Sequence, residues 1–262
     1  MKMAEQSDEI VIRECTTVEE FDACVRVQRE AFGLPDLELS PRRHLIVARS
    51  AGGWTLGAFA GERTVGFVLN QIAVWRDRNS GAEQTIGYSH MMAVAKDFQN
   101  RGVGARLKWA QRERALSEGR RFIRWTWDPV QSRNAHFNLN RLGVVVRHYT
   151  ENYYGTDYSA VTGRFAEPLG IDSDRLVAEW ALDSARVEAF AQGRTPEPLG
   201  KPAASVQIPS NWATLVREDP EAARRELLRV RVEFQTAFAA GLVCAGFNRD
   251  PACPRYLFYS DE

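Results

Sequence analysis

Hydrophobic residues recur along the chain with two spacings, which separate the expected strands from the expected helices. Alternating or continuous apolar runs predict strands over residues 9–13, 54–60, 64–74, 85–94, 122–127, 144–149 and 175–182. Apolar positions at helical spacing, with capping residues or proline at the start, predict helices over residues 17–32, 40–49, 104–117 and 133–142. A helix between two buried strands is typical of a mixed α/β sheet, which is the fold class we expect.

The C-terminal part of the chain has a different pattern. Glycine and proline are frequent between residues 191 and 209, which predicts a linker-like crossing. A helix over 220–240 and a hairpin of strands 242–248 and 256–259 are expected after it. One helix and one hairpin bury too little surface to fold alone. We therefore expect a main domain of residues 1–192 and a small α+β extension, residues 193–262, that packs on it.

Composition excludes several classes of function. The chain has 262 residues, with 34 Lys and Arg against 34 Asp and Glu, so no net charge draws it to nucleic acid or a membrane. The first ten residues are polar, and no run of about 18 apolar residues occurs, so we expect a cytoplasmic protein. The four cysteines lack metal-ligand spacing and are expected to be unpaired, with no metal site.

A glycine-containing turn carries the strongest chemical signal. The strand over 85–94 runs into Gln99–Gly104, and a helix follows at once. Free N–H groups in the first turn of a helix, together with the helix dipole, form an anion site suited to phosphate. The spacing is Gln-x-x-Gly-x-Gly, which is neither that of a P-loop nor that of a Rossmann dinucleotide site.

This turn resembles the acyl-CoA pyrophosphate loop of the GNAT (GCN5-related) N-acyltransferases, with the usual preceding strand ending in Met92-Ala93-Val94. The resemblance implies the GNAT fold, a mixed and mostly antiparallel sheet that is splayed at the CoA site and flanked by helices. It also implies acetyl-CoA or another acyl-CoA as cosubstrate. The CoA-binding residues implied are Met92, Val94, Gln99, Arg101, Gly102, Val103, Gly104, Ala105, Arg106, Asn134 and Phe137.

A second block extends the resemblance over nearly the whole chain. Trp127-Asp128-Pro129 and the helix over 133–143 are similar to those of a subgroup of larger bacterial GNAT proteins with a C-terminal extension. Residues 152–155 and 174–180 also match that subgroup. Its members are mostly unassigned, and some are linked to N-succinylation of amino acids.

The sequence departs from the family at the catalytic acid. The common pattern has a tyrosine four residues before the glycine that ends the helix, and Leu139 stands there. The nearest other phenols are Tyr149, Tyr153 and Tyr154, of which Tyr154 is our candidate acid. A buried tyrosine is more often packed and hydrogen-bonded than catalytic.

The strand before the turn supplies the other candidates. By resemblance, the backbone amide near Met92 polarises the thioester carbonyl. Strand alternation is expected to place Tyr88, His90 and Met92 on one face. His90 is the candidate general base because histidine titrates in the useful range, and a packed structural histidine is the alternative. Asp128, which also fits a turn or cap, and Glu30 are competing candidates.

These features predict direct transfer of an acyl group, acetyl by family default, from CoA to the amine of a small molecule such as an amino acid. Succinyl transfer is the alternative reaction, with Arg42, Arg141 and Arg147 as cations available for a distal carboxylate. A CoA-binding sensor without transferase activity is the alternative of another class. The expected partners are acyl-CoA and a small amine, with no nucleic acid or membrane, and a homodimer is allowed.

Overall fold

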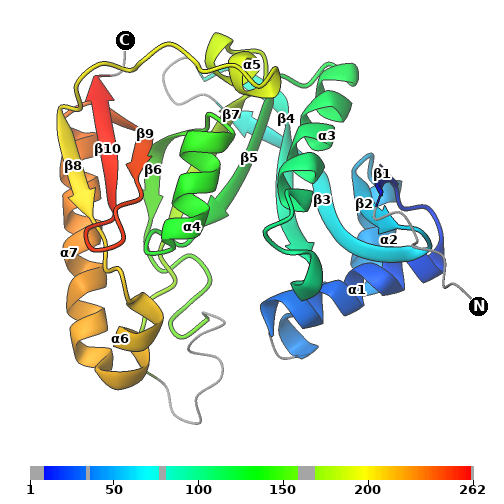
Figure 1. Ribbon diagram of the computed structural model, residues 1–262, viewed down its shortest axis with the longest axis horizontal. Helices are drawn as coiled ribbons and strands as arrows, with labels where there is room; N and C mark the ends of the chain where they lie inside the picture. Colours follow the sequence, from blue (N-terminus) through cyan, green and yellow to red (C-terminus); the bar gives the residue numbers. More distant parts are fainter. Residues whose placement is uncertain (1–8, 34–35, 77–80, 159–168, 261–262) are drawn as a thin grey trace, which may run out of the picture. The chain divides into compact units, whose positions relative to one another are not determined.

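The computed structural model describes residues 9–33, 36–76, 81–158 and 169–260 (Figure 1). The chain forms two compact units, residues 1–123 and 124–262, and the boundary falls inside strand β5 (Phe122–Trp127). The polar N-terminal residues 1–8, on which the expected location of the protein partly rests, lie outside the described residues.

The first unit is built on an antiparallel sheet with strand order β1-β2-β3-β4. Strands β3 and β4 form a long hairpin whose register runs from Gly66↔Val94 to Arg76↔Glu83. The elements of this unit are β1 (Ile10–Glu14), α1 (Val18–Phe32), η1 (Asp36–Glu38), α2 (Arg42–Ser50), β2 (Trp54–Ala60), β3 (Arg63–Arg76), β4 (Glu83–Val94), η2 (Lys96–Phe98) and α3 (Val103–Ser117).

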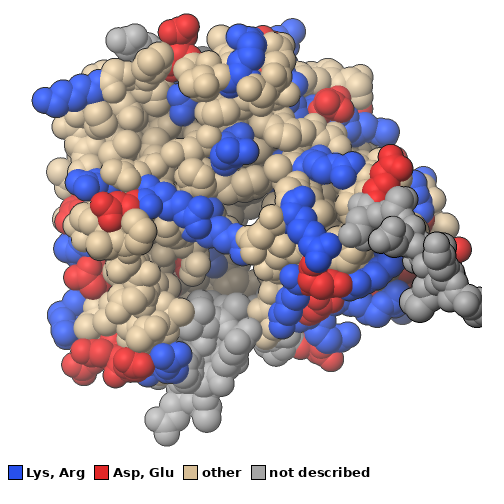
Figure 2. Space-filling view, viewed as in Figure 1, with Lys and Arg blue, Asp and Glu red and all other residues tan. Residues whose placement is uncertain are grey.

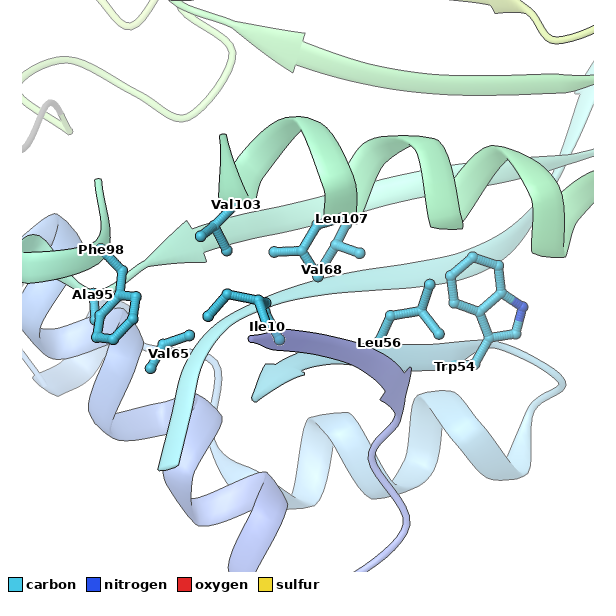
Figure 3. Packing of buried hydrophobic residues seen from close by; sticks show 10 residues of the cluster. Ile10, Trp54, Leu56, Val65, Val68, Ala95, Phe98, Val103 and Leu107 are labelled. Carbon is cyan, nitrogen blue, oxygen red and sulfur yellow. The ribbon is translucent and has the colours of Figure 1, made fainter. Parts of the chain in front are cut away.

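Two hydrophobic clusters hold helices on opposite faces of this sheet. On one face, Val103 and Leu107 of α3 pack with Ile10, Val68 and other buried side chains (Figure 3). On the other face, α1 and α2 pack through a second cluster, whose buried members are Cys15, Phe21, Cys24, Val27, Leu45, Ala48, Phe59, Phe67, Leu69 and Ala93. The end of strand β4 before the turn is therefore packed on both faces, which fixes the side chains there.

The predicted cap of the first helix is confirmed. The Thr17 side chain accepts a hydrogen bond from Glu20 N, and the Glu20 carboxylate accepts one from Thr17 N, so both halves of a capping box are present. The helix ends at Gly33, whose φ of 61° lies in the left-handed region that glycine tolerates best.

The second unit contains six strands in the order β5-β7-β6-β9-β10-β8. The pairs β6/β7, β6/β9, β9/β10 and β10/β8 are antiparallel. Its further elements are α4 (Ser132–Ala135), the π-helical turn η3 (His136–Arg141), β6 (Val145–Thr150), β7 (Arg175–Ala181), α5 (Ala185–Ala191), β8 (Ala204–Gln207), α6 (Trp212–Glu218), α7 (Pro220–Ala239), β9 (Leu242–Asn248) and β10 (Arg255–Ser260).

Residues 193–262 are joined to the rest of the second unit by specific contacts. The hydroxyl of Tyr256 donates to the carbonyl of Pro129 at 2.7 Å and accepts from Trp127 Nε1 at 3.2 Å. Asn140 and Phe247 exchange two hydrogen bonds between the η3 turn and β9. The C-terminal segment thus supplies strands to the sheet of this unit. Its separation from residues 1–192 as a domain of its own stays a prediction.

An ion-pair network attaches α7 to the start of β7. The guanidinium of Arg231 binds both carboxylate oxygens of Asp174, at 2.7 and 2.8 Å, and also reaches Asp172 and Glu151. Asp174 additionally accepts from the Tyr149 hydroxyl at 2.6 Å. Because Asp174 is 1% exposed, this carboxylate depends on its partners for solvation.

One expectation about the second unit was wrong, and two of its features were not predicted. The crossing over 191–209 is not only a linker, because β8 lies within it and pairs with β10. Helices α5 and α6 were not predicted. The helix expected over 133–142 begins as α-helix and continues as a π-helical turn, where Leu142 N donates to Phe137 O.

Candidate active site

The predicted glycine turn joins β4 to α3 in the first unit. The Gln99 side chain donates to the carbonyl of Val94 at 3.0 Å, which closes the turn on the end of the strand. Asn100 and Gly102 have φ values of 63° and 80°, in the left-handed region. Within the described part of the chain, no side chain caps the first turn of α3, so its leading N–H groups can receive an anion.

The two glycines of the turn have different roles. A Cβ atom at Gly102 would meet nothing within 4 Å, so its backbone conformation explains the glycine. At Gly104 a Cβ atom would lie 3.4 Å from the Met92 Cε atom, so this residue packs close to β4. The start of α3 is therefore held against the strand that carries the expected oxyanion amide.

The two arginines expected to reach CoA phosphates are both exposed. Arg101 lies with its guanidinium carbon 5.2 Å from the centre of the Phe98 ring, within cation–π range. Arg106 donates from Nη2 to the carbonyl of Ile10 on β1. Figure 2 shows basic and acidic side chains interspersed on one face of the molecule, in keeping with the balanced composition.

His90 occupies a β-bulge in β4. Leu69 of β3 pairs with Met91, and the next residue, Asn70, pairs with Ser89, so His90 has no partner in the register. A bulge inserts one residue into the alternation of a strand and re-aims the side chains beside it.

The bulge changes which residues share a face, so the expected alternation of His90 with Met92 is wrong. Ser89 contacts Lys108 of α3, and Met92 packs in the cluster beneath α3. His90 contacts Ser40, before α2, and Met91 packs in the cluster of α1 and α2. The imidazole of His90 and the side chain of Met92 therefore lie on opposite faces of the sheet.

The His90 imidazole is half-buried beside a second histidine. Its Nε2 atom lies 3.4 Å from Ser40 Oγ, and its ring centre lies 5.0 Å from that of His44 in an edge-on arrangement. Burial lowers the pKa of His90, and the nearby His44 lowers it further. A lowered pKa keeps the imidazole unprotonated at neutral pH, as a general base requires.

A buried polar network lies on the other face of the same strand. Lys108 Nζ donates to Ser89 Oγ at 2.8 Å and to Gln111 Oε1 at 3.0 Å. Gln111 in turn donates to Asn70 of β3 at 3.1 Å. Burial lowers the pKa of Lys108 well below its ordinary value. This network attaches α3 to the strands immediately beside the bulge.

The two remaining residues predicted to bind CoA lie in the second unit. The position at which GNAT proteins commonly have a catalytic tyrosine lies there too. Asn134 is exposed in α4, and Phe137 is half-buried in the π-helical turn. Leu139, at the position of the common tyrosine, is fully buried. The side chain at this position is therefore part of the core.

Of the three other tyrosines considered as the catalytic acid, one has a structural role and two are accessible. Tyr149 donates its hydroxyl to Asp174, and burial raises its pKa above the ordinary value. Tyr153 and Tyr154 are 45% and 43% exposed, with ring centres 4.6 Å apart. Arg175 lies 4.9 Å from the centre of the Tyr154 ring. Tyr154 is therefore accessible to solvent, whereas the Tyr149 hydroxyl is bound in the Asp174 network.

The competing bases have structural partners. Asp128 accepts a hydrogen bond from Val130 N at 3.0 Å, the expected turn, and burial raises its pKa. Glu30 accepts from Lys96 N at 2.6 Å and so supports the segment after β4. Among the described residues, no group of three or more His, Cys, Asp or Glu side chains gathers as a metal site would require.

Sequence reasoning missed three of the residues described above, namely Ser40, His44 and Lys108. The four-residue spacing of Ser40 and His44 is a usable signal, because side chains at this spacing near a helix start can meet. Lysine is typical of a solvated helix face, and only the fold shows that Lys108 is 3% exposed.

Comparison with known proteins agrees with the arrangement of strand β4, the glycine turn and helix α3. Residues 17–143 match the model of the acetyltransferase (GNAT) family. Residues 17–143 therefore form a GNAT acetyltransferase domain. No curated protein sequence matches it significantly.

Solved GNAT structures share its fold at low sequence identity. The ribosomal-protein-S18-alanine N-acetyltransferase from Escherichia coli is 14% identical with a TM-score of 0.51, covering 68% of this chain and 96% of that one. Arabidopsis thaliana NAA60, solved with acetyl-CoA, is 13% identical with a TM-score of 0.51, covering 67% and 100%. Chaetomium thermophilum Naa20, solved with a bisubstrate analogue, is 14% identical with a TM-score of 0.50, covering 65% and 86%. The expected fold, a mixed and mostly antiparallel α/β sheet flanked by helices, is confirmed.

The GNAT domain match ends at Gly143, inside the second unit. Among the described residues of this GNAT protein, none of the helices combines the length and apolar character that a bilayer crossing needs.

Proposed function

We propose that this GNAT enzyme transfers an acetyl group from acetyl-CoA directly to the amine of a small molecule such as an amino acid. The observation that carries the proposal is the segment from His90 to Gly104. It holds an imidazole of lowered pKa, the candidate oxyanion amide and the candidate phosphate turn on one strand–turn–helix unit. Such a unit can align donor and base without a covalent intermediate.

The donor is held, in this proposal, by the turn and the strand end. The N–H groups that begin α3 receive the pyrophosphate, with Gln99, Gly102, Val103, Gly104 and Ala105 forming the cradle. Arg101 and Arg106 add positive charge at its rim. Val94 pairs with the pantetheine arm, and Asn134 and Phe137 contact the remainder of CoA.

The chemistry requires deprotonation of the amine and stabilisation of a tetrahedral oxyanion. His90 accepts the proton of the ammonium group, and the free amine attacks the thioester carbonyl. The backbone N–H of Met92 donates to the developing oxyanion, and one such donor typically contributes about 2.7–4 kcal/mol in the transition state. Tyr154 is the proposed proton donor to the departing CoA thiolate, since the side chain at position 139 is a buried leucine.

Succinyl transfer has less support. Two of the three cations available for a distal carboxylate are already in ion pairs, Arg42 with Asp22 at 2.9 Å and Arg147 with Glu179 at 3.0 Å. Acetyl-CoA has no distal carboxylate, so acetyl transfer requires none of these arginines.

A thiol-release assay with acetyl-CoA and succinyl-CoA against a panel of amino acids and other small amines tests the proposal. We expect turnover with acetyl-CoA, and we expect His90→Ala to lower kcat by at least about 100-fold with little change in CoA affinity. His148→Ala, on β6, is the matched histidine control. Saturable CoA binding without turnover on any amine would instead indicate a CoA sensor, and unchanged turnover in His90→Ala would remove His90 from catalysis.

A further inference from the structure

A continuous chain of polar contacts leads from His90 to α2 and β3. Ser40 Oγ lies 3.4 Å from His90 Nε2 and 3.0 Å from His44 Nδ1. On the far side of its ring, His44 Nε2 lies 2.9 Å from Gln71 Nε2. Three contacts therefore connect the candidate base with a second imidazole and an amide. Neither of these two groups is among the site residues that the resemblance to GNAT proteins implies.

The central member of this chain is held rigidly. The Gln28 side chain of α1 donates to Ser40 O at 3.1 Å and accepts from Ser40 N at 3.0 Å. Gln28 is fully buried, and Ser40 is 8% exposed. Two hydrogen bonds to a buried side chain fix the backbone of Ser40, and this places the Ser40 hydroxyl beside the neighbouring rings.

The polar side chains in hydrogen-bond contact with the two rings are neutral, namely Ser40 and Gln71. Several ionic groups of α1 and α2 have other partners, as Asp22 does with Arg42, Glu30 with Lys96 N, and Arg29 with Asp36. Arg43, next to His44 in sequence, is exposed. After burial, the nearby His44 is the group that lowers the pKa of His90.

We propose that His44, acting through Ser40, is a positioning residue that orients the His90 imidazole and prevents its protonation. This inference rests on the proposed role of His90 as base. It deepens that role by adding two residues, Ser40 before α2 and His44 within α2. Both act on the base and not on the substrate amine.

The geometry indicates how the pair works. Because Ser40 engages Nε2 of His90, Nδ1 is the ring nitrogen left for the amine. Nδ1 keeps its lone pair when Nε2–H donates to Ser40 Oγ and the hydroxyl donates to His44 Nδ1. His44 Nε2 then carries a proton, so the Gln71 amide must turn its oxygen toward that atom, a 180° rotation of the terminal group.

Two imidazoles at this separation cannot both be charged without strong repulsion. This repulsion adds to burial in lowering the pKa of His90, so the base stays available at a lower pH than an isolated buried histidine would allow. Active enzyme is the form with His90 unprotonated, and activity therefore rises as pH increases through the pKa of His90. Removing His44 should raise that pKa and move the acidic limb of the kcat/KM profile to higher pH.

The experiment combines NMR titration of the histidine rings with steady-state kinetics on the full chain. The chain has four histidines, so each ring signal can be assigned by single substitution. We expect His44→Gln to raise the pKa of His90 and to shift the acidic limb upward. Ser40→Ala should lower kcat by roughly tenfold to 100-fold at unchanged KM for acetyl-CoA, part of what a general base supplies. Ser40→Thr, which retains the hydroxyl, should restore most of that loss.

His148→Gln, in the second unit, is the control and should leave the His90 titration unchanged. His44→Asn replaces His44→Gln if the latter does not fold. An unchanged His90 titration in both His44 variants would overturn the inference, whatever the activity. Unchanged turnover in His90→Ala would instead overturn the proposed base, and the NMR titration would still decide whether the two histidines are coupled.

Discussion

Replacement of Lys108 measures the effect of a buried ionisable side chain inside the first unit. Lys108 is 3% exposed, and Ser89 and Gln111, which accept hydrogen bonds from it, are neutral. Burial lowers its pKa well below the ordinary value of a lysine. We therefore expect Lys108 to lose its proton when the chain folds, which makes stability depend on pH.

The sign and size of this dependence follow from proton binding. In the unfolded chain, Lys108 holds its proton up to a pKa of about 10.4, whereas in the folded chain it has released the proton at lower pH. Between the two pKa values the unfolded state binds one more proton, so stability rises with pH by about 1.4 kcal/mol per pH unit. Lys108→Met keeps a linear side chain of similar length and removes this contribution.

Urea unfolding at several pH values between 7 and 9.5 tests the prediction. The stability difference between wild type and Lys108→Met should change in favour of the wild type by about 1.4 kcal/mol for each pH unit inside the window. Lys201→Met removes an exposed lysine and is the control, with a curve parallel to the wild type. If Lys108→Met also runs parallel to the wild type, Lys108 is charged in the folded chain and the reasoning fails. Lys108→Gln serves the same test if the methionine variant does not fold.

Two further substitutions test the candidate phosphate turn and the C-terminal attachment. Gly102→Glu should weaken CoA binding by roughly 100-fold or more in calorimetry, because it places a carboxylate where phosphate is expected. Gly119→Glu, with a similar φ and equally open space at the other end of α3, should retain the affinity, and equal affinities in both variants would contradict the turn. Arg231→Leu should destabilise the chain by about 3–5 kcal/mol in denaturant unfolding, since it leaves Asp174 buried without its cation. Arg225 forms an exposed ion pair with Glu221 at 4.0 Å, so Arg225→Leu should change the free energy of unfolding by less than about 1 kcal/mol. Similar losses in the Arg231 and Arg225 variants would show that burial of the ion pair does not matter.

The first unit and the donor turn could be predicted from the sequence because local signals there agree. The capping box at Thr17, the apolar strand ending at Val94 and the glycines before α3 each specify a short segment. The fold follows from their order, since helices and strands of these lengths have few ways to pack. The candidate phosphate site follows as well, because it needs only backbone groups and a left-handed glycine.

Non-local features could not be predicted. The bulge at His90 depends on how β3 and β4 pair, which the sequence of β4 alone does not specify. Strand β8 lies in a segment rich in proline and glycine, where pairing with β10 overrides local propensity. Lysine is a residue type typical of a surface, and the burial of Lys108 is visible only once α3 is placed on the sheet.

The contacts of β4 on its two faces also suggest how the candidate base and the candidate donor site can be aligned. Ordinary strand alternation places two consecutive residues, Ser89 and His90, in contact with different elements on opposite faces of β4. Ser89 is bound by Lys108 of α3, the helix that begins at the candidate phosphate turn, and His90 is bound through Ser40 to α2. A shift of α3 along the strand would therefore disturb the Ser89 contact one residue from the base. Because acyl transfer loses rate steeply with small misalignments of amine and thioester, this shared attachment is a physical reason for burying a lysine at a cost in stability.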